Sequence, residues 1–300
     1  MNAGRRAVRT VRVEAQAKLN LFLRVLSREP SGYHQLETLF QRIALADSVT
    51  VHSGGTGRSL DSRGADVGPV ERNLAWRAAV AYAEAAGGPS AFRIEVEKRI
   101  PVGGGLGGGS ADAAAVLRAL NALSERPLDD GVLATIAFSL GADVPYLLST
   151  HALAIGSGHG ERLHPLEPLP SRDVLLAVPS FGVSSGDAFR WYAEEHAARR
   201  PGTRATLPVG PMPQWKTIAS LAANDLEGAV IAHHAEIGAL RDALRRGGAF
   251  LVQMSGSGST VFGVFEMPLG GRSFPELDTL GGRAIHTKTL EQVASVELTK

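Results

Sequence analysis

The chain has no cysteine among its 300 residues, which excludes disulfide bonds, thiolate metal sites and cysteine nucleophiles. It contains no apolar run of about 18 residues, so we expect no transmembrane helix, and its start lacks the apolar core of a signal peptide. The formal net charge is only +1, which gives no reason to expect a nucleic-acid partner. These absences favour a cytoplasmic protein with neither a membrane nor a polyanion as partner.

Glycine is abundant instead, and many of the 35 glycines fall in three clusters. The densest cluster, Pro101 to Asp112, holds six glycines in seven positions. Alternating residues over 92–98 predict a strand before it, and the apolar run 113–120 predicts a helix after it, with Ser110 or Asp112 as N-cap. A strand, a glycine loop and a helix start expose backbone N–H groups to one concave point, so we predict a phosphate-binding loop rather than a flexible linker.

The type of phosphate loop is narrowed by what surrounds it. The Walker form ends in Gly-Lys-Ser/Thr, which is absent here. Gly103, Gly105 and Gly108 fit the dinucleotide pattern G-x-G-x-x-G, but any glycine run does so. The second strand and acidic residue of a dinucleotide fold are missing, because Pro127 and a predicted helix over 132–140 follow. A dinucleotide-dependent oxidoreductase therefore ranks last.

Two further segments carry groups suited to binding. Tyr33 and His34 leave a Ser-Gly turn, where they could form a platform for a flat ring; a plain surface turn is the alternative. The third glycine cluster, 254–259, alternates Ser and Gly between predicted strands and should offer another anion-binding surface. Lys18 and Asp143, taken alone, are ordinary strand-edge and turn residues.

The length suggests about two domains. We place their boundary near the second glycine cluster, 156–160, with one domain over 1–155 and the other over 156–300. The alternation over 11–25 predicts two strands or one long bent strand. The other expected elements are strands over 39–44, 48–52, 152–155, 174–178, 250–253 and 260–265, a hairpin loop over 53–68, a helix over 73–86, a helical region over 224–244 and a long loop over 200–214. Asn73 should cap the helix that runs to Ala86, and Gly141 should end the helix over 132–140.

Taken in order, these motifs resemble the GHMP kinase superfamily of small-molecule kinases. The matching pieces are Ala17-Lys18-Leu19-Asn20-Leu21, Gly32-Tyr33-His34, Pro101 to Ser110, Gly141-Ala142-Asp143-Val144-Pro145, Asn224-Asp225-Leu226-Glu227 and Ser255-Gly256-Ser257-Gly258. The resemblance implies an α+β, two-domain fold with the active site in the cleft between the domains. It also implies ATP as phosphoryl donor, with Mg²⁺.

The first two pieces point to one branch of that superfamily. Its members phosphorylate the 2-hydroxyl of a cytidine-diphosphate-linked methylerythritol, in the non-mevalonate route to isoprenoid precursors. The implied partner is thus a small molecule with a cytidine diphosphate group. Another sugar or polyol kinase of the same fold is an alternative. A non-catalytic nucleotide-binding protein of this fold is a third, and it would lack the pair Lys18 and Asp143.

The resemblance also assigns roles. Asp143 matches the catalytic aspartate that accepts the proton of the attacking hydroxyl, and Lys18 matches a lysine that stabilises the developing oxyanion. Either Phe189 or Trp191 would complete the cytosine site. The implied ATP-binding residues are Pro101, Val102, Gly103, Gly104, Gly105, Leu106, Gly107, Gly108, Gly109, Ser110 and Ala111, and the implied substrate-binding residues are Asn20, Tyr33, His34, Gly256, Ser257 and Gly258.

One departure from the superfamily pattern concerns the end of the glycine loop. Many members have two serines there, whereas this chain has Ser110 followed by Ala111 and Asp112. Asp112 then either helps to hold Mg²⁺ or caps the helix. Capping is slightly favoured, because two carboxylates near a triphosphate repel each other without a metal ion. The protein ligands of Mg²⁺ stay open.

Overall fold

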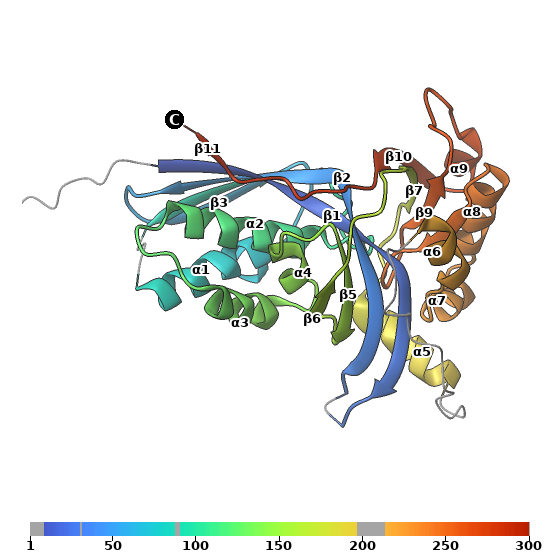
Figure 1. Cartoon of the computed structure of the whole chain (residues 1–300), viewed down its shortest axis with the longest axis horizontal. Coiled ribbons are helices and arrows are strands. Elements are labelled where there is room, and N and C mark those ends of the chain that lie inside the picture. The colour runs from blue at the N-terminus through green and yellow to red at the C-terminus, as the bar shows by residue number, and fades with distance from the viewer. Residues whose placement is uncertain (1–8, 31, 88–90, 197–213, 300) are drawn as a thin grey trace, which may run out of the picture.

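The computed structural model describes residues 9–30, 32–87, 91–196 and 214–299. It contains two sheets, each covered by helices (Figure 1). The larger sheet has seven strands in the order β11-β1-β2-β4-β3, with β5 and β6 extending it from β2. Its strands are β1 (Arg9–Arg28), β2 (His34–Ser53), β3 (Arg58–Arg63), β4 (Phe92–Glu97), β5 (Leu153–Gly158), β6 (Arg162–Pro165) and β11 (Glu297–Thr299).

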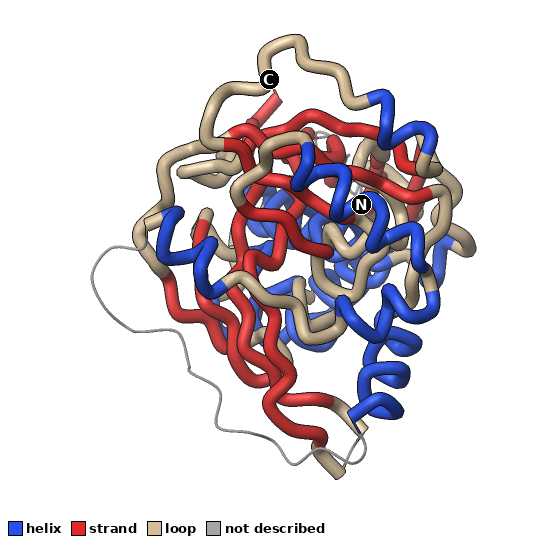
Figure 2. The backbone as a smooth tube through the Cα atoms, turned by 90° about the vertical axis from the view of Figure 1, so that its right-hand side faces the viewer, coloured by secondary structure: helices blue, strands red, loops and turns tan. Residues whose placement is uncertain are grey.

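The hairpin of β1 and β2 organises this sheet. Of the two strands or one long bent strand predicted over 11–25, the structure has the single strand β1. Three register shifts against β2 bend it. The two pieces predicted over 39–44 and 48–52 are one strand, because β2 changes partner along its length. Its first part pairs with β5 and its last part with β4. The end of the hairpin extends beyond the helical layer and lies beside α5 (Ser185–His196; Figures 1 and 2).

Helices cover one face of the large sheet (Figure 1). Alanines dominate α2, and most of them are buried, so this helix packs closely on β1 and β2. The cap of α1 is as predicted, since the Asn73 side chain accepts a hydrogen bond from the Ala75 N–H. The helical elements of this layer are η1 (Val70–Arg72), α1 (Leu74–Ala86), α2 (Gly108–Leu123), α3 (Asp130–Leu140) and α4 (Val144–Leu148).

The smaller sheet has the order β10-β7-β9-β8 and its own apolar core. The helical region expected over 224–244 is two helices, because the chain leaves helical geometry at His234. The elements here are β7 (Asp173–Pro179), α5, α6 (Trp215–Leu221), α7 (Glu227–His233), α8 (Ala235–Arg246), β8 (Leu251–Met254), β9 (Val261–Phe265), α9 (Pro275–Thr279) and β10 (Gly282–Lys288).

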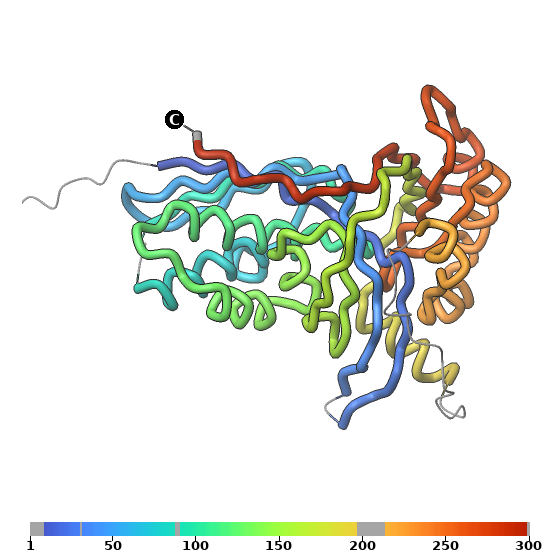
Figure 3. The backbone as a smooth tube through the Cα atoms, viewed as in Figure 1, coloured from blue at the N-terminus to red at the C-terminus, as the bar shows by residue number. Residues whose placement is uncertain are grey.

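The mixture of helices and sheets is the α+β fold expected. Two details differ from the expectations. The segment 53–68 is not a simple hairpin loop, because β3 pairs there in parallel with β4. The boundary drawn at 155/156 falls within β5, and the chain passes to the second sheet only between β6 and β7. The chain finally returns to the first sheet, where β11 pairs with β1 (Figure 3).

Among the described residues, no helix is both long and apolar enough to span a membrane. The loop expected over 200–214 lies, except for its last residue, outside the described residues.

Candidate functional site

A pocket of about 1830 Å³ lies where the long hairpin, the glycine loop and α5 meet. Its lining includes most of the residues predicted for the site. Ala111 and Gly258 are not among them, since Ala111 belongs to the apolar core and Gly258 packs on Met254. The predicted residues that line the pocket are Lys18, Asn20, Tyr33, His34, the whole run 101–110, Asp143, Gly256 and Ser257.

The glycine loop joins β4 to α2, as predicted, but the predicted caps of α2 are wrong. The helix begins at Gly108, and Gly107 takes the N-cap position with a left-handed φ of 73°. Ser110 and Asp112 therefore lie within the helix. The first N–H groups of a helix have no acceptor within it, so the start of α2 presents donors and a positive dipole end to the pocket.

The loop is fixed against the third glycine cluster. The Gly105 carbonyl accepts a hydrogen bond from Ser255 Oγ at 3.1 Å, and the Gly104 carbonyl accepts one from the Thr260 N–H at 3.2 Å. Asn224 holds that cluster in turn, donating from Nδ2 to the carbonyls of Met254 and Gly256. Segments far apart in the sequence thus form one continuous backbone surface.

Lys18 lines the pocket and is only 3% exposed. Its Nζ donates to Asn20 Oδ1 at 2.6 Å and to the Gly105 carbonyl at 2.9 Å, and it lies 3.4 Å from Asp143 Oδ2. Asn20 is oriented by its own bond from Nδ2 to Thr38 Oγ1. The ammonium group therefore has two hydrogen-bond acceptors and one carboxylate partner, which together hold Lys18 in one position.

Asp143 occupies the N-cap position of the short helix α4, and its side chain is one-third exposed. The neighbouring Gly141 ends α3, as predicted. A Cβ at Gly141 would lie 4.0 Å from Ser110 Oγ, so Ser110 is beside the segment that carries Asp143. A carboxylate and an ammonium group next to a rim of N–H donors suit the transfer of a phosphoryl group to a hydroxyl.

A buried charge cluster lies under the glycine loop. Lys98 Nζ donates to carboxylate oxygens of both Asp47 and Asp112. Asp47 also accepts from the backbone N–H groups of Arg99 and Ile100, which fixes the chain as it leaves β4. Asp112 does not cap the helix, because it lies within α2. It lines the pocket beside Lys98, which holds its carboxylate, and it is only 3% exposed.

Burial, with a smaller contribution from the neighbouring Asp47, raises the pKa of Asp112 to about 7 against the opposing effect of Lys98. Burial also disfavours the charge on Lys98, but the two carboxylates outweigh it and raise the pKa of that ammonium. The cluster therefore has one ammonium group for two carboxyl groups, and the raised pKa of Asp112 favours a proton on that carboxyl group.

Aromatic rings gather at the end of the pocket near the hairpin turn. His34 stacks on Phe189 with ring centroids 5.0 Å apart, and Tyr33 stacks on His159 at the same distance. Trp191 instead contacts His233 and does not line the pocket. Burial, with a contribution from Arg28, lowers the pKa of His34, so its imidazole is neutral at pH 7.

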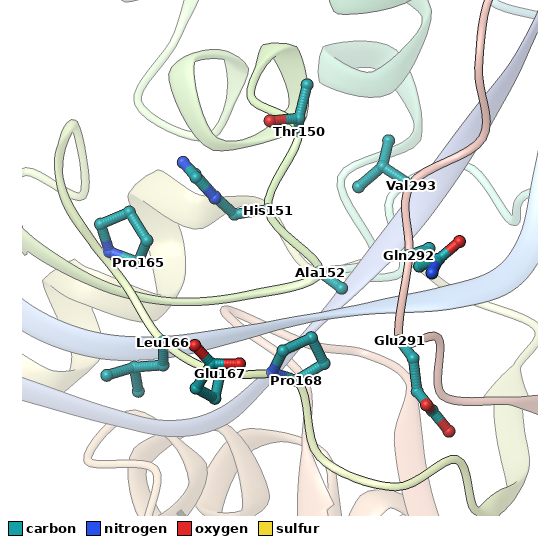
Figure 4. A pocket seen from close by; sticks show the side chains of 10 residues that line it. All are labelled: Thr150, His151, Ala152, Pro165, Leu166, Glu167, Pro168, Glu291, Gln292 and Val293. Atoms are coloured by element: carbon teal, nitrogen blue, oxygen red, sulfur yellow. The ribbon is translucent and has the colours of Figure 1, made fainter. Parts of the chain in front are cut away.

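A separate hollow of about 560 Å³ is lined by residues 150–152, 165–168 and 291–293 (Figure 4). No predicted site residue lines it. In Figure 4 its ionisable side chains, His151, Glu167 and Glu291, come from three separate segments and do not converge on one point. Among the described residues, no group of three or more His, Asp or Glu side chains could hold a metal ion.

Two family models match the chain, "GHMP kinases N terminal domain" over residues 73–151 and "GHMP kinases C terminal" over 212–277. A protein of Desulfotalea psychrophila named 4-diphosphocytidyl-2-C-methyl-D-erythritol kinase is 38% identical over 261 residues, covering 86% of each chain. One of Symbiobacterium thermophilum with the same name is 34% identical and covers 93% of this chain and 99% of its own.

A crystal structure of 4-(cytidine 5'-diphospho)-2C-methyl-D-erythritol kinase matches with a TM-score of 0.75 and 39% identity, over 93% of this chain and 98% of that one. The chain belongs to the 4-diphosphocytidyl-2-C-methyl-D-erythritol kinase family of GHMP kinases. Both family models fall on parts that build the pocket of this kinase, one on the glycine loop and the other on the third glycine cluster.

Several pocket residues of this kinase were not predicted. Thr38 orients Asn20, Lys98 lies beside the glycine loop, and His159 lies against Tyr33. Thr38 and His159 are distant in sequence from the residues they contact, whereas Lys98 precedes the glycine loop by three residues. No local pattern marks Thr38 or His159, since only the pairing of strands brings them to the pocket.

Proposed function

We propose that this kinase transfers the γ-phosphoryl group of ATP to the 2-hydroxyl of 4-diphosphocytidyl-2-C-methyl-D-erythritol. The observation that carries the proposal is the pair Lys18 and Asp143, 3.4 Å apart beside the glycine loop, in a chain of this family. Both side chains line the same pocket as the aromatic rings near the hairpin turn.

The phosphates of ATP bind to the glycine loop. The backbone N–H groups of the loop and the start of α2 offer donors and a positive dipole end to the triphosphate. The donor set fits Mg²⁺, which in kinases is held by substrate phosphates, water and one or two protein oxygens. The hydroxyl of Ser110, at the start of α2 and in the lining of the pocket, is the protein oxygen that would hold it. Mg²⁺ would supply neutralisation of the phosphate charge.

Asp143 accepts the proton of the substrate hydroxyl as that oxygen forms its bond to the γ-phosphorus. The bond from the γ-phosphorus to its bridging oxygen breaks, and ADP leaves with that electron pair. Lys18 stabilises the negative charge that develops on the attacking oxygen, because its ammonium is fixed by Asn20 and the Gly105 carbonyl. The reaction needs positioned charges rather than a covalent enzyme intermediate.

The cytosine ring binds near Tyr33, His34 and Phe189. Phe189 rather than Trp191 is the second aromatic residue, because only Phe189 lines the pocket. A neutral His34 can donate one hydrogen bond and accept another, which suits the polar edge of a pyrimidine. The His34 and Phe189 centroids are 5.0 Å apart. A base between two rings needs about 7 Å, or two van der Waals contacts, so the rings must separate when the base enters.

The proposal is tested by measuring ADP formation with Mg²⁺ and two acceptors, the cytidylyl substrate and free 2-C-methyl-D-erythritol. We expect turnover that requires the nucleotide, and ³¹P NMR should show a new phosphomonoester on the polyol. Equal turnover of both acceptors would instead indicate another small-molecule kinase of the same fold. No turnover with either acceptor would favour a non-catalytic nucleotide-binding protein.

The cytoplasmic location stays a prediction.

A further inference from the structure

Arg42 on β2 is a charged side chain in the interior, and it is 2% exposed. Its Nη2 donates to the backbone carbonyls of Tyr146 at 2.8 Å, Leu147 at 2.7 Å and Ser149 at 3.3 Å. Its Nη1 donates to the Gln16 carbonyl at 3.3 Å, and the guanidinium carbon lies 4.8 Å from the centre of the Tyr146 ring. The side chain therefore binds main chain almost entirely, and most of that main chain is the end of α4.

Burial of the guanidinium group in this way costs free energy of folding, so stability by itself does not explain it. Burial lowers the pKa of Arg42 to about 10, and no carboxylate among the described residues contributes to that shift. Its Nε is buried without a hydrogen-bond partner. Even buried ion pairs can often be replaced by apolar side chains of similar volume without loss of stability. The position of the guanidinium therefore calls for another explanation.

The segment that Arg42 holds is too short to be stable by itself. α4 has five residues, whereas isolated helices shorter than about 12–15 residues are marginal in water. The last carbonyl groups of a helix accept no hydrogen bond from within the helix, and they form the negative end of its dipole. Arg42 supplies both the donors and the positive charge that this end requires. The helix is thereby fixed at its C-terminal end.

The other end of α4 carries Asp143, which faces Lys18. Arg42 and Lys18 are direct partners in the register of β2 and β1. Directly opposite residues in an antiparallel pair share one face of the sheet. Two neighbouring cations on that face thus contact the two ends of one short helix, Lys18 at its start and Arg42 at its finish.

We propose that Arg42 is a positioning residue for the reaction, which anchors α4 so that Asp143 stays at its distance from Lys18 and the acceptor oxygen. This rests on the proposed function, in which Asp143 accepts the proton. Arg42 is buried and does not line the pocket, so it would act on the chemical step through the placement of Asp143. A displacement of about 1 Å at a reacting group can cost about 10²-fold in rate.

The test is the kinetics of Arg42→Lys, which keeps the charge but loses the planar fork that reaches several carbonyls at once. We expect kcat to fall by about tenfold or more, while KM for ATP and for the cytidylyl substrate stay within about twofold. Arg118→Lys is the matched control, because Arg118 is also buried in part and donates to the carbonyl of Ala294. Its kcat should equal that of the wild type.

A double-mutant cycle separates positioning from a merely structural role. In the Asp143→Asn background, Arg42→Lys should change the residual kcat by less than about twofold, because its effect passes through the missing carboxylate. Full additivity, or a lower melting temperature with an unchanged kcat, would overturn the inference. If Asp143→Asn alone keeps the wild-type kcat, the proposed function of that residue fails instead. Should Arg42→Lys not fold, Arg42→Gln carries the same test without a buried charge.

Discussion

Replacing Gly105 by alanine should displace the glycine loop from the third glycine cluster. Gly105 has a φ of +74°, in the left-handed region, which costs an alanine about 1–2 kcal/mol. Its new Cβ would also collide with the Ser255 carbonyl oxygen and lie 2.9 Å from that of Gly258. Both obstacles are backbone atoms, so a side-chain rotation cannot relieve the contact.

The expected loss follows from the bonds that the displaced loop breaks. Two neutral hydrogen bonds, from Ser255 and from the Thr260 N–H, are worth about 1 kcal/mol each, and the one from Lys18 about 1.5–3 kcal/mol. With the backbone strain, the variant should lose about 4 kcal/mol or more of its free energy of unfolding. At about 2 °C per kcal/mol, the melting temperature should fall by about 8 °C or more.

The assay is thermal unfolding by circular dichroism, together with KM for ATP, which should rise because the loop no longer has its shape. Gly109→Ala is the matched control: it lies in α2, and its Cβ would meet nothing nearer than 3.6 Å. Alanine there favours the helix by up to about 1 kcal/mol, so its melting temperature should not fall. A Gly105→Ala variant with the stability and KM of the wild type would refute this account of the loop.

Three further outcomes follow from the site. Phe189→Ala should raise KM for the cytidylyl substrate about tenfold, from about 1–3 kcal/mol per stacked base, and spare KM for ATP; an unchanged KM, or an equal rise in Trp191→Ala, would contradict the assignment. Because the pKa of His34 is lowered from 6.5, KM for that substrate should rise as the pH falls through the imidazole's titration; a similar rise in His34→Gln would exclude His34 as its cause. Asp112 has its pKa raised from 3.8 to about 7, so the folded state keeps a proton that the unfolded state releases, and its contribution to stability declines as the pH rises through that window. The melting temperature of Asp112→Asn, relative to the wild type, should therefore increase between about pH 5 and about pH 8; a difference that does not change with pH would show that Asp112 does not titrate there.

The elements of the site were predictable where a local pattern specifies them. The alternation in β4, the glycines after it and the apolar run of α2 each carry their own signal, and Asn73 before α1 does too. The position of the α2 cap was wrong because Ser and Asp are common caps, whereas a left-handed glycine at 107 starts the helix earlier. The residue preferences at helix starts favoured Ser110 or Asp112, but the geometry of the glycine loop places the N-cap at Gly107.

The contacts between distant segments were not predictable from local pattern. The proximity of Lys18 and Asp143 was inferred only from a resemblance, since nothing in either segment refers to the other. The pairing of Lys98 with Asp47 and Asp112, and the contact of Arg42 with α4, depend on strand register and on helix placement. Contacts of this kind between distant segments leave no signal in the spacing or the composition of the sequence.

The central claim is that Asp143 and Lys18 act together on the acceptor hydroxyl. Its most direct test is the kcat of Asp143→Asn with the cytidylyl substrate and saturating ATP, beside Asp130→Asn, which changes an exposed carboxylate outside the pocket. We expect kcat to fall by about 10²-fold or more with KM for ATP unchanged, and no effect in the control. A kcat near that of the wild type in Asp143→Asn would contradict the account.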